Sequence, residues 1–85
     1  MNNKLELLKK RLIYRAAYRG TKEMDILLSS FVNKYINQFD ESLLAELEKF
    51  LNFEDEIILN YYQKGIIKKK IDKNKVSKIF KDYKL

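Results

Sequence analysis

The chain has no cysteine, no histidine and no proline, and it has only two glycines among its 85 residues. Without cysteine and histidine, disulfides, thiol nucleophiles, imidazole acid–base catalysis and the usual zinc ligands are all excluded. With so few residues that interrupt helices, long helices are favoured over a turn-rich β fold. We therefore expect an all-α protein that is not itself an enzyme.

Long apolar runs are absent too. No run approaches the roughly 20 apolar residues that span a bilayer, and residues 1–6 lack the apolar core of a signal peptide. We expect a soluble, cytoplasmic protein with no membrane span. The preference for Lys, Asn, Ile and Tyr, whose codons tend to be rich in A and T, indicates an A+T-rich bacterial genome.

The charge is unevenly spread along what we expect to be a single domain, residues 1–85. Residues 1–23 carry seven cations and two anions, residues 24–62 two cations and eight anions, and residues 63–85 nine cations and two anions. An acidic middle between basic ends describes a dipolar molecule, not a uniformly basic one. We therefore predict no specific nucleic-acid binding.

Apolar residues recur at steps of three and four, which predicts about five short helices. They span about residues 4–18, 21–39, 40–51, 56–65 and 72–84, the last being a basic C-terminal helix. Asp40 is placed to cap the third helix and Gly65 to end the fourth. Residues 66–70 are ambiguous. The short connections favour a compact antiparallel bundle.

The junction between the first two helices holds the most informative residues. Arg19 and Glu23 are four apart, and such a pair is most often a solvated ion pair worth about 0.3–0.5 kcal/mol. Gly20 between them is consistent with a simple helix junction. The functional reading is that Gly20, which has no side chain, leaves room for a partner's backbone. Arg19 on one side would then donate hydrogen bonds through its guanidinium group, and Glu23 on the other side would accept them. The residues alone leave both readings open.

Other polar and aromatic groups carry weaker signals. The lysines from Lys68 onward could contact phosphates, but a solvated helix face explains them better. The carboxylates at 54–56 lack EF-hand spacing and suit a helix start. Helical spacing predicts that Tyr14, Tyr18 and the pair at 61–62 are core or rim aromatics. The chain also lacks a nucleotide-binding loop.

A longer pattern resembles a known family. The stretch from Arg19 to Phe31 is similar to the signature of the succinate dehydrogenase flavinylation (assembly) factors, bacterial proteins related to mitochondrial succinate dehydrogenase assembly factor two. Supporting features lie in order along residues 11–65, at 11–14, 39–41, 47–48, 54–55, 59–61 and 65. The last twenty residues share only basic helical character with the family, and Tyr18 departs from its basic or polar preference.

The resemblance implies a five-helix assembly factor. It would bind the flavoprotein subunit of succinate dehydrogenase, or that of fumarate reductase, and promote covalent attachment of FAD to a histidine of that subunit. FAD would belong to the partner, with no cofactor bound stably by this chain, which we expect to be monomeric when free. The partner-binding residues carried over are Arg19, Gly20, Glu23, Asp25, Arg15 and Lys22.

Two alternatives remain beside this interpretation. One is an antitoxin-like or regulatory protein-interaction module, and the other is a small basic nucleic-acid-binding protein.

Overall fold

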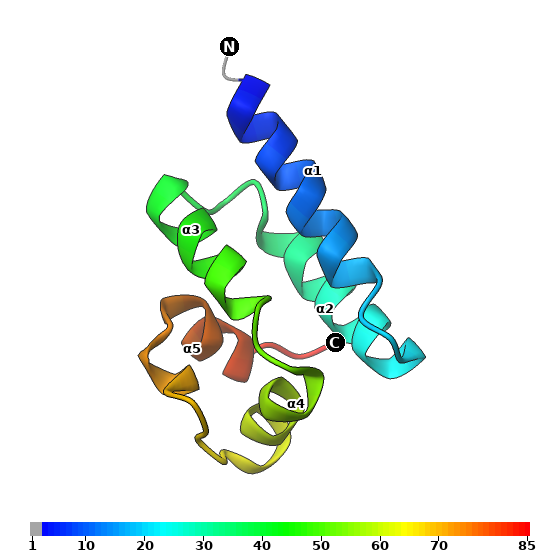
Figure 1. Ribbon diagram of the computed structural model, residues 1–85, viewed down its shortest axis with the longest axis vertical. Coiled ribbons are helices and arrows are strands. Elements are labelled where there is room, and N and C mark those ends of the chain that lie inside the picture. Colours follow the sequence, from blue (N-terminus) through cyan, green and yellow to red (C-terminus); the bar gives the residue numbers. More distant parts are fainter. Residues whose placement is uncertain (1–2) are drawn as a thin grey trace.

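Figure 1 shows the computed structural model of the chain, which describes residues 3–85. The helices are α1 (Asn3–Ala17), α2 (Lys22–Tyr35), α3 (Glu41–Phe50), α4 (Asp55–Lys64), the short 3₁₀ helix η1 (Ile71–Lys73) and α5 (Lys75–Lys81). The described residues contain no strand. The prediction of an all-α fold of about five short helices is confirmed.

The core forms where the apolar faces of the helices meet, and α2 lies at its centre. Five residues of α2 are buried, namely Met24, Leu27, Leu28, Phe31 and Val32. The Phe31 ring lies 6.3 Å from that of Phe50, 5.0 Å from Phe80 and 5.3 Å from Tyr83, measured between centroids. Each fully buried side chain of this kind contributes about 1.5–3 kcal/mol. One aromatic cluster therefore joins α2, α3, α5 and the C-terminal residues.

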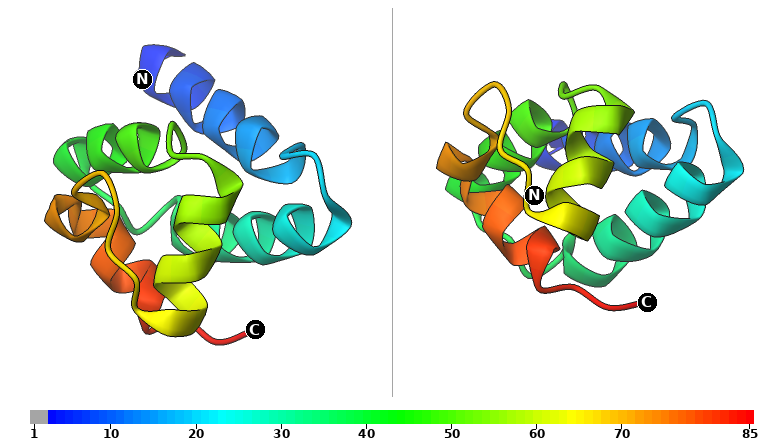
Figure 2. Two further views of the ribbon diagram at one scale, coloured as in Figure 1. Left: turned by 60° about the horizontal axis from the view of Figure 1, so that its bottom comes forward. Right: turned by 90° about the horizontal axis from the view of Figure 1, so that it is seen from below.

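The helices do not all run antiparallel. Figure 1 shows α1 and α2 as an antiparallel pair, joined by a short turn, and α5 packs against both α3 and α4. Figure 2 shows α4 crossing α2 steeply instead of lying along it. The expected antiparallel arrangement thus holds for α1, α2 and α3, which alternate in direction in Figures 1 and 2, but not for α4, because the four-residue connection between α3 and α4 turns the chain sharply.

The predicted caps are confirmed. The Asp40 side chain accepts a hydrogen bond from the Leu43 backbone N–H at 2.9 Å. Gly65 ends α4 in the left-handed conformation with φ 69°, which costs glycine nothing. These two residues set the limits of α3 and α4, as the sequence indicates.

Two predicted helix ends are wrong. The second helix stops at Tyr35, not near Phe39, because a turn after it brings Phe39 back into the core, where its ring stacks on Tyr35 at 5.6 Å. The last helix covers only Lys75–Lys81. It begins late because the Asn74 side chain accepts from the Ser77 N–H at 2.9 Å, and it ends early so that Tyr83 can fold back onto Phe31.

Candidate functional site

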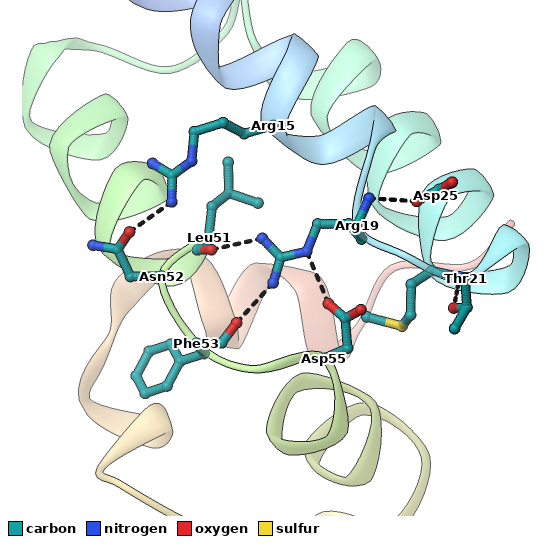
Figure 3. Close-up of polar contacts among 9 residues, drawn as sticks. Arg15, Arg19, Thr21, Asp25, Leu51, Asn52, Phe53 and Asp55 are labelled. Carbon is teal, nitrogen blue, oxygen red and sulfur yellow. Dashed lines mark hydrogen bonds and ion pairs between the residues drawn. The ribbon is translucent and has the colours of Figure 1, made fainter.

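Arg19 sits in the connection between α1 and α2 and ties it to the connection between α3 and α4. Its Nε lies 2.8 Å from Asp55 Oδ1. Its Nη1 donates to the Leu51 carbonyl at 2.6 Å and its Nη2 to the Phe53 carbonyl at 2.7 Å (Figure 3). The side chain is only 11% exposed. The guanidinium group that we expected to face a partner is therefore hydrogen-bonded within the chain, where it joins the two connections.

Two further contacts fix the same junction. One turn before Arg19, Arg15 donates from Nη2 to Asn52 Oδ1 at 2.6 Å (Figure 3). Asp25 in the first turn of α2 accepts from the Arg19 backbone N–H at 2.5 Å. Both residues thus position the junction, and Asp25 also lies where the helix dipole favours a carboxylate.

Gly20 has a backbone that other residues adopt only with strain. Its φ is +126°, and a Cβ built on it would meet nothing within 4 Å. The next residue, Thr21, begins α2 by accepting from the Met24 N–H at 3.3 Å. Gly20 therefore meets a local backbone need and also leaves open space at the surface of the molecule.

The exposed charged residues of this junction are Lys22 and Glu23. The ion pair considered for Arg19 and Glu23 does not form, since Arg19 pairs with Asp55 instead. Among residues 3–85, no ion pair engages either Lys22 or Glu23. One turn further along α2, Ile26 is 51% exposed. A cation, a carboxylate and an apolar side chain are thus displayed beside Gly20, and we call residues 20–26 the docking edge.

An open cleft of about 430 Å³ lies beside the docking edge, lined in part by Tyr14 and Tyr18. Their rings are in contact, with centroids 4.6 Å apart, and the residues are 65% and 70% exposed. The expected core or rim placement holds for Tyr61, which is buried, and for Tyr62, which is half-buried against the core, whereas Tyr14 and Tyr18 are largely exposed.

Sequence reasoning missed the pairing of Arg19 with Asp55. The two residues are 36 apart in the chain, and Asp55 is explained equally well as a helix-start carboxylate. No local pattern indicates which loop a given arginine will reach. Within residues 3–85, no cluster of three or more potential ligands that could hold a metal ion was found, and no helix there has the length and apolar character to cross a membrane.

Comparison with known proteins points to one family. A family model described as "Flavinator of succinate dehydrogenase" matches residues 10–84. The chain is 40% identical over 78 residues to "Succinate dehydrogenase assembly factor 2, mitochondrial" of Scheffersomyces stipitis, covering 91% of this chain and 52% of that protein. It is 39% identical over 54 residues to the protein of the same name in Schizosaccharomyces japonicus, covering 64% of this chain and 38% of that protein.

A third relative, of the same name in Drosophila virilis, is 48% identical over 44 residues, covering 52% of this chain and 28% of that protein. The chain thus spans about half, or less, of the length of the curated relatives it matches. All three are named mitochondrial, which contradicts the cytoplasmic location that we expected and gives no support to a bacterial source. Their names describe an assembly factor, not the antitoxin-like module or nucleic-acid binder kept as alternatives.

Proposed function

The chain belongs to the succinate dehydrogenase flavinator family, and on that premise we propose that it binds the flavoprotein subunit of succinate dehydrogenase and promotes covalent attachment of FAD to it. The relatives named as assembly factors of succinate dehydrogenase support this role. The compartment we propose is the one that holds succinate dehydrogenase, which those names give as mitochondrial. We propose the flavoprotein subunit of fumarate reductase, which the resemblance of the sequence also implied, as a second client.

The contact in this proposal is made by the docking edge. Lys22 and Glu23 are exposed and unpaired within the described chain, so they are free to meet donors and acceptors of a partner. The open space at Gly20 allows a partner's backbone to come close. Arg19, Arg15 and Asp25 act as positioning residues, because their polar groups are engaged inside the chain.

The chain's part in flavin attachment is to hold its partner, without turnover of its own. FAD and the residue that it modifies both belong to the partner in this proposal. A rigid helper that fixes the partner's segments in one geometry raises the rate because the reacting groups no longer need to find each other. The hydrogen bonds that Arg19 donates to Asp55, Leu51 and Phe53 give the docking edge that rigidity.

No stable cofactor site on this chain is part of the proposal. The sequence has no glycine-rich loop that would cradle the phosphates of a dinucleotide. The two arginines nearest the cleft already donate to Asn52, Asp55 and two backbone carbonyls. These features support the proposal that FAD is bound by the partner and not by this chain.

Glu23→Ala tests the contact directly. We expect it to weaken binding to the purified flavoprotein subunit by roughly tenfold, since one charge-assisted hydrogen bond is removed. The melting temperature should stay unchanged, because Glu23 is exposed. Glu6→Ala, an exposed glutamate on α1, is the matched control and should bind normally. Normal binding by Glu23→Ala would remove Glu23 from the contact.

Variants at Gly20 can distinguish a need for its backbone conformation from a contact with the partner. An 85-residue chain is short enough for chemical synthesis, so Gly20 can be replaced by L-alanine or by D-alanine. At φ +126° the L residue should cost about 1–3 kcal/mol in the free energy of unfolding, whereas the D residue should largely restore stability. If the open space at Gly20 serves a partner, D-alanine will still weaken binding. Full binding by the stable D-alanine chain would restrict Gly20 to a backbone role.

A further inference from the structure

The connection between α4 and η1 forms a second exposed surface that the docking edge does not use. Every residue from Gln63 to Lys70 is exposed. Ile66 is 40% exposed and Ile67 56% exposed, so two adjacent branched apolar side chains face solvent. We call residues 64–70 the basic loop, because the two isoleucines lie between Lys64 and the run Lys68 to Lys70.

The charge of the basic loop is almost wholly uncompensated. Lys69 Nζ lies 3.6 Å from Glu54 Oε1, but both side chains are about 70% exposed, so this pair contributes little. Within residues 3–85, no ion pair engages Lys64, Lys68 or Lys70. Residues 63–85 carry nine lysines and two aspartates. The loop thus presents four lysines, only one of which has an ion pair within residues 3–85, next to two exposed isoleucines.

The backbone of the basic loop is held in an unfavourable conformation. Lys69 has φ 52° and Lys70 has φ 60°, and residues with a side chain rarely adopt the left-handed region, least of all twice in succession. Buried Ile71 follows directly and anchors the loop to the core. The chain therefore keeps three consecutive lysines at a strained turn where asparagine or glycine would fit more easily.

We propose that the basic loop binds the surface of an anionic lipid membrane. Two exposed isoleucines can enter the boundary between head groups and acyl chains, while the flanking lysines keep their ammonium groups among anionic head groups. Lysines near such a surface are attracted by its negative potential. Two exposed isoleucines with lysines on both sides of them in the sequence match this chemistry on both counts.

Other partners fit the basic loop less well. Lysine is depleted in the cores of protein–protein interfaces, so a surface that is mostly lysine favours lipid over protein. Nucleic acid would be read by arginine or stacked on aromatic rings, and residues 63–71 contain neither arginine nor an aromatic residue. If the loop bound a nucleic-acid phosphate backbone, the isoleucines would stay in water, whereas at a membrane they would be buried among lipid.

The position of the basic loop supports a separate task. In both views of Figure 2 the yellow-to-orange segment lies on the opposite side of the molecule from the α1–α2 turn. The chain can therefore rest on a membrane with the basic loop and leave the docking edge open. This inference does not depend on the proposed function.

Sedimentation with lipid vesicles tests the proposal. The full chain is mixed in 0.1 M NaCl with vesicles of phosphatidylcholine containing 30 mol% phosphatidylserine, and with vesicles of phosphatidylcholine alone. We expect binding to the anionic vesicles only, weakened about tenfold or more in 1 M NaCl, where the screening length falls from about 10 Å to 3 Å. Equal binding to both vesicles, or no binding to either, overturns the proposal.

Variants locate the contact. Lys68→Asn/Lys69→Asn/Lys70→Asn removes three charges while keeping residues that tolerate positive φ, and it should weaken binding about 100-fold at roughly fivefold per lysine. Ile66→Ser/Ile67→Ser should weaken it roughly tenfold or more. The control with equal net charge, Lys4→Asn/Lys9→Asn/Lys10→Asn on α1, should bind within about threefold of the unchanged chain.

The outcomes are distinct. An equal loss in the α1 control, or unchanged binding by the isoleucine variant, overturns the proposal. So does tighter binding to a 20-base-pair DNA duplex that is indifferent to the isoleucines, which would assign the surface to nucleic acid. Circular dichroism confirms the fold of each variant. Should the double isoleucine change unfold the chain, Ile67→Ser alone replaces it, since Ile67 is the more exposed of the two.

Discussion

At the scale of single residues, neighbours in the sequence have opposite roles. Arg19 faces inward and holds two loops through three donated hydrogen bonds, while Lys22 and Glu23 face outward. A family signature therefore mixes residues that shape a surface with residues that form it. The sequence singled out these residues as a group, but it could not separate the inward-facing from the outward-facing ones, because the side-chain partners of Arg19 lie more than thirty positions away in the chain.

Arg19→Lys tests the inward role. Lysine keeps the charge but cannot donate to Asp55 and two carbonyls at once, so we expect the free energy of unfolding to fall by roughly 2 kcal/mol. For a domain of this size, that lowers the melting temperature by about 8–16 °C. Arg15→Lys is the matched control, because Arg15 makes one exposed bond to Asn52, and it should cost under about 1 kcal/mol. Equal effects of the two changes would contradict the role of Arg19 in joining the two loops.

At the scale of helices, capping residues were predicted well and helix ends less well. Asp40 and Gly65 act locally, through contacts within a few residues, so the sequence alone identifies them. The ends of α2 and α5 are set by Phe39 and Tyr83, which leave the helical path to reach the aromatic core. Such endings depend on contacts between distant helices, and periodicity does not contain that information.

Two N-terminal positions provide a clean comparison. Asp40→Ala removes a side-chain cap from α3 and should lower the free energy of unfolding by about 1 kcal/mol. Glu54 precedes α4 at the equivalent position but makes no capping hydrogen bond, so Glu54→Ala should change stability by under about 0.5 kcal/mol. Urea titration of both variants measures the difference. A larger loss for Glu54→Ala would show that its exposed ion pair with Lys69 matters more than the cap.

At the scale of the whole molecule, one ionisable group makes the free energy of unfolding depend on pH in the alkaline range. Burial raises the pKa of the Tyr61 phenol above its ordinary value of 10.0, and the carboxylates of Asp72 and Asp82 add to the shift. The folded state therefore prefers the neutral phenol, whereas the unfolded chain ionises it first. This contribution is complete below pH 10 and is lost as the pH rises toward the folded-state pKa.

Tyr61→Phe should therefore flatten the alkaline loss of stability. Melting temperatures measured from pH 8 to pH 11 should fall less steeply in this variant than in the unchanged chain. Tyr14→Phe, at a residue that is 65% exposed, controls for the removal of one phenol. Parallel curves for Tyr61→Phe and the unchanged chain would show that Tyr61 does not set the alkaline limit.

The whole molecule also separates its two proposed surfaces. The docking edge lies at the α1–α2 turn, and the basic loop lies on the opposite side (Figure 2). Variants of the basic loop should therefore leave binding to the flavoprotein subunit intact, and Glu23→Ala should leave vesicle binding intact.

Covalent flavin on the partner is the most direct measurement of the proposed role. The flavoprotein subunit of succinate dehydrogenase is expressed with and without this chain in cells that lack their own factor, then denatured and resolved on a gel. Flavin fluorescence on the subunit band should rise strongly when the chain is present, and should rise less with Glu23→Ala. Equal fluorescence with and without the chain, at equal amounts of subunit, would contradict the proposed function.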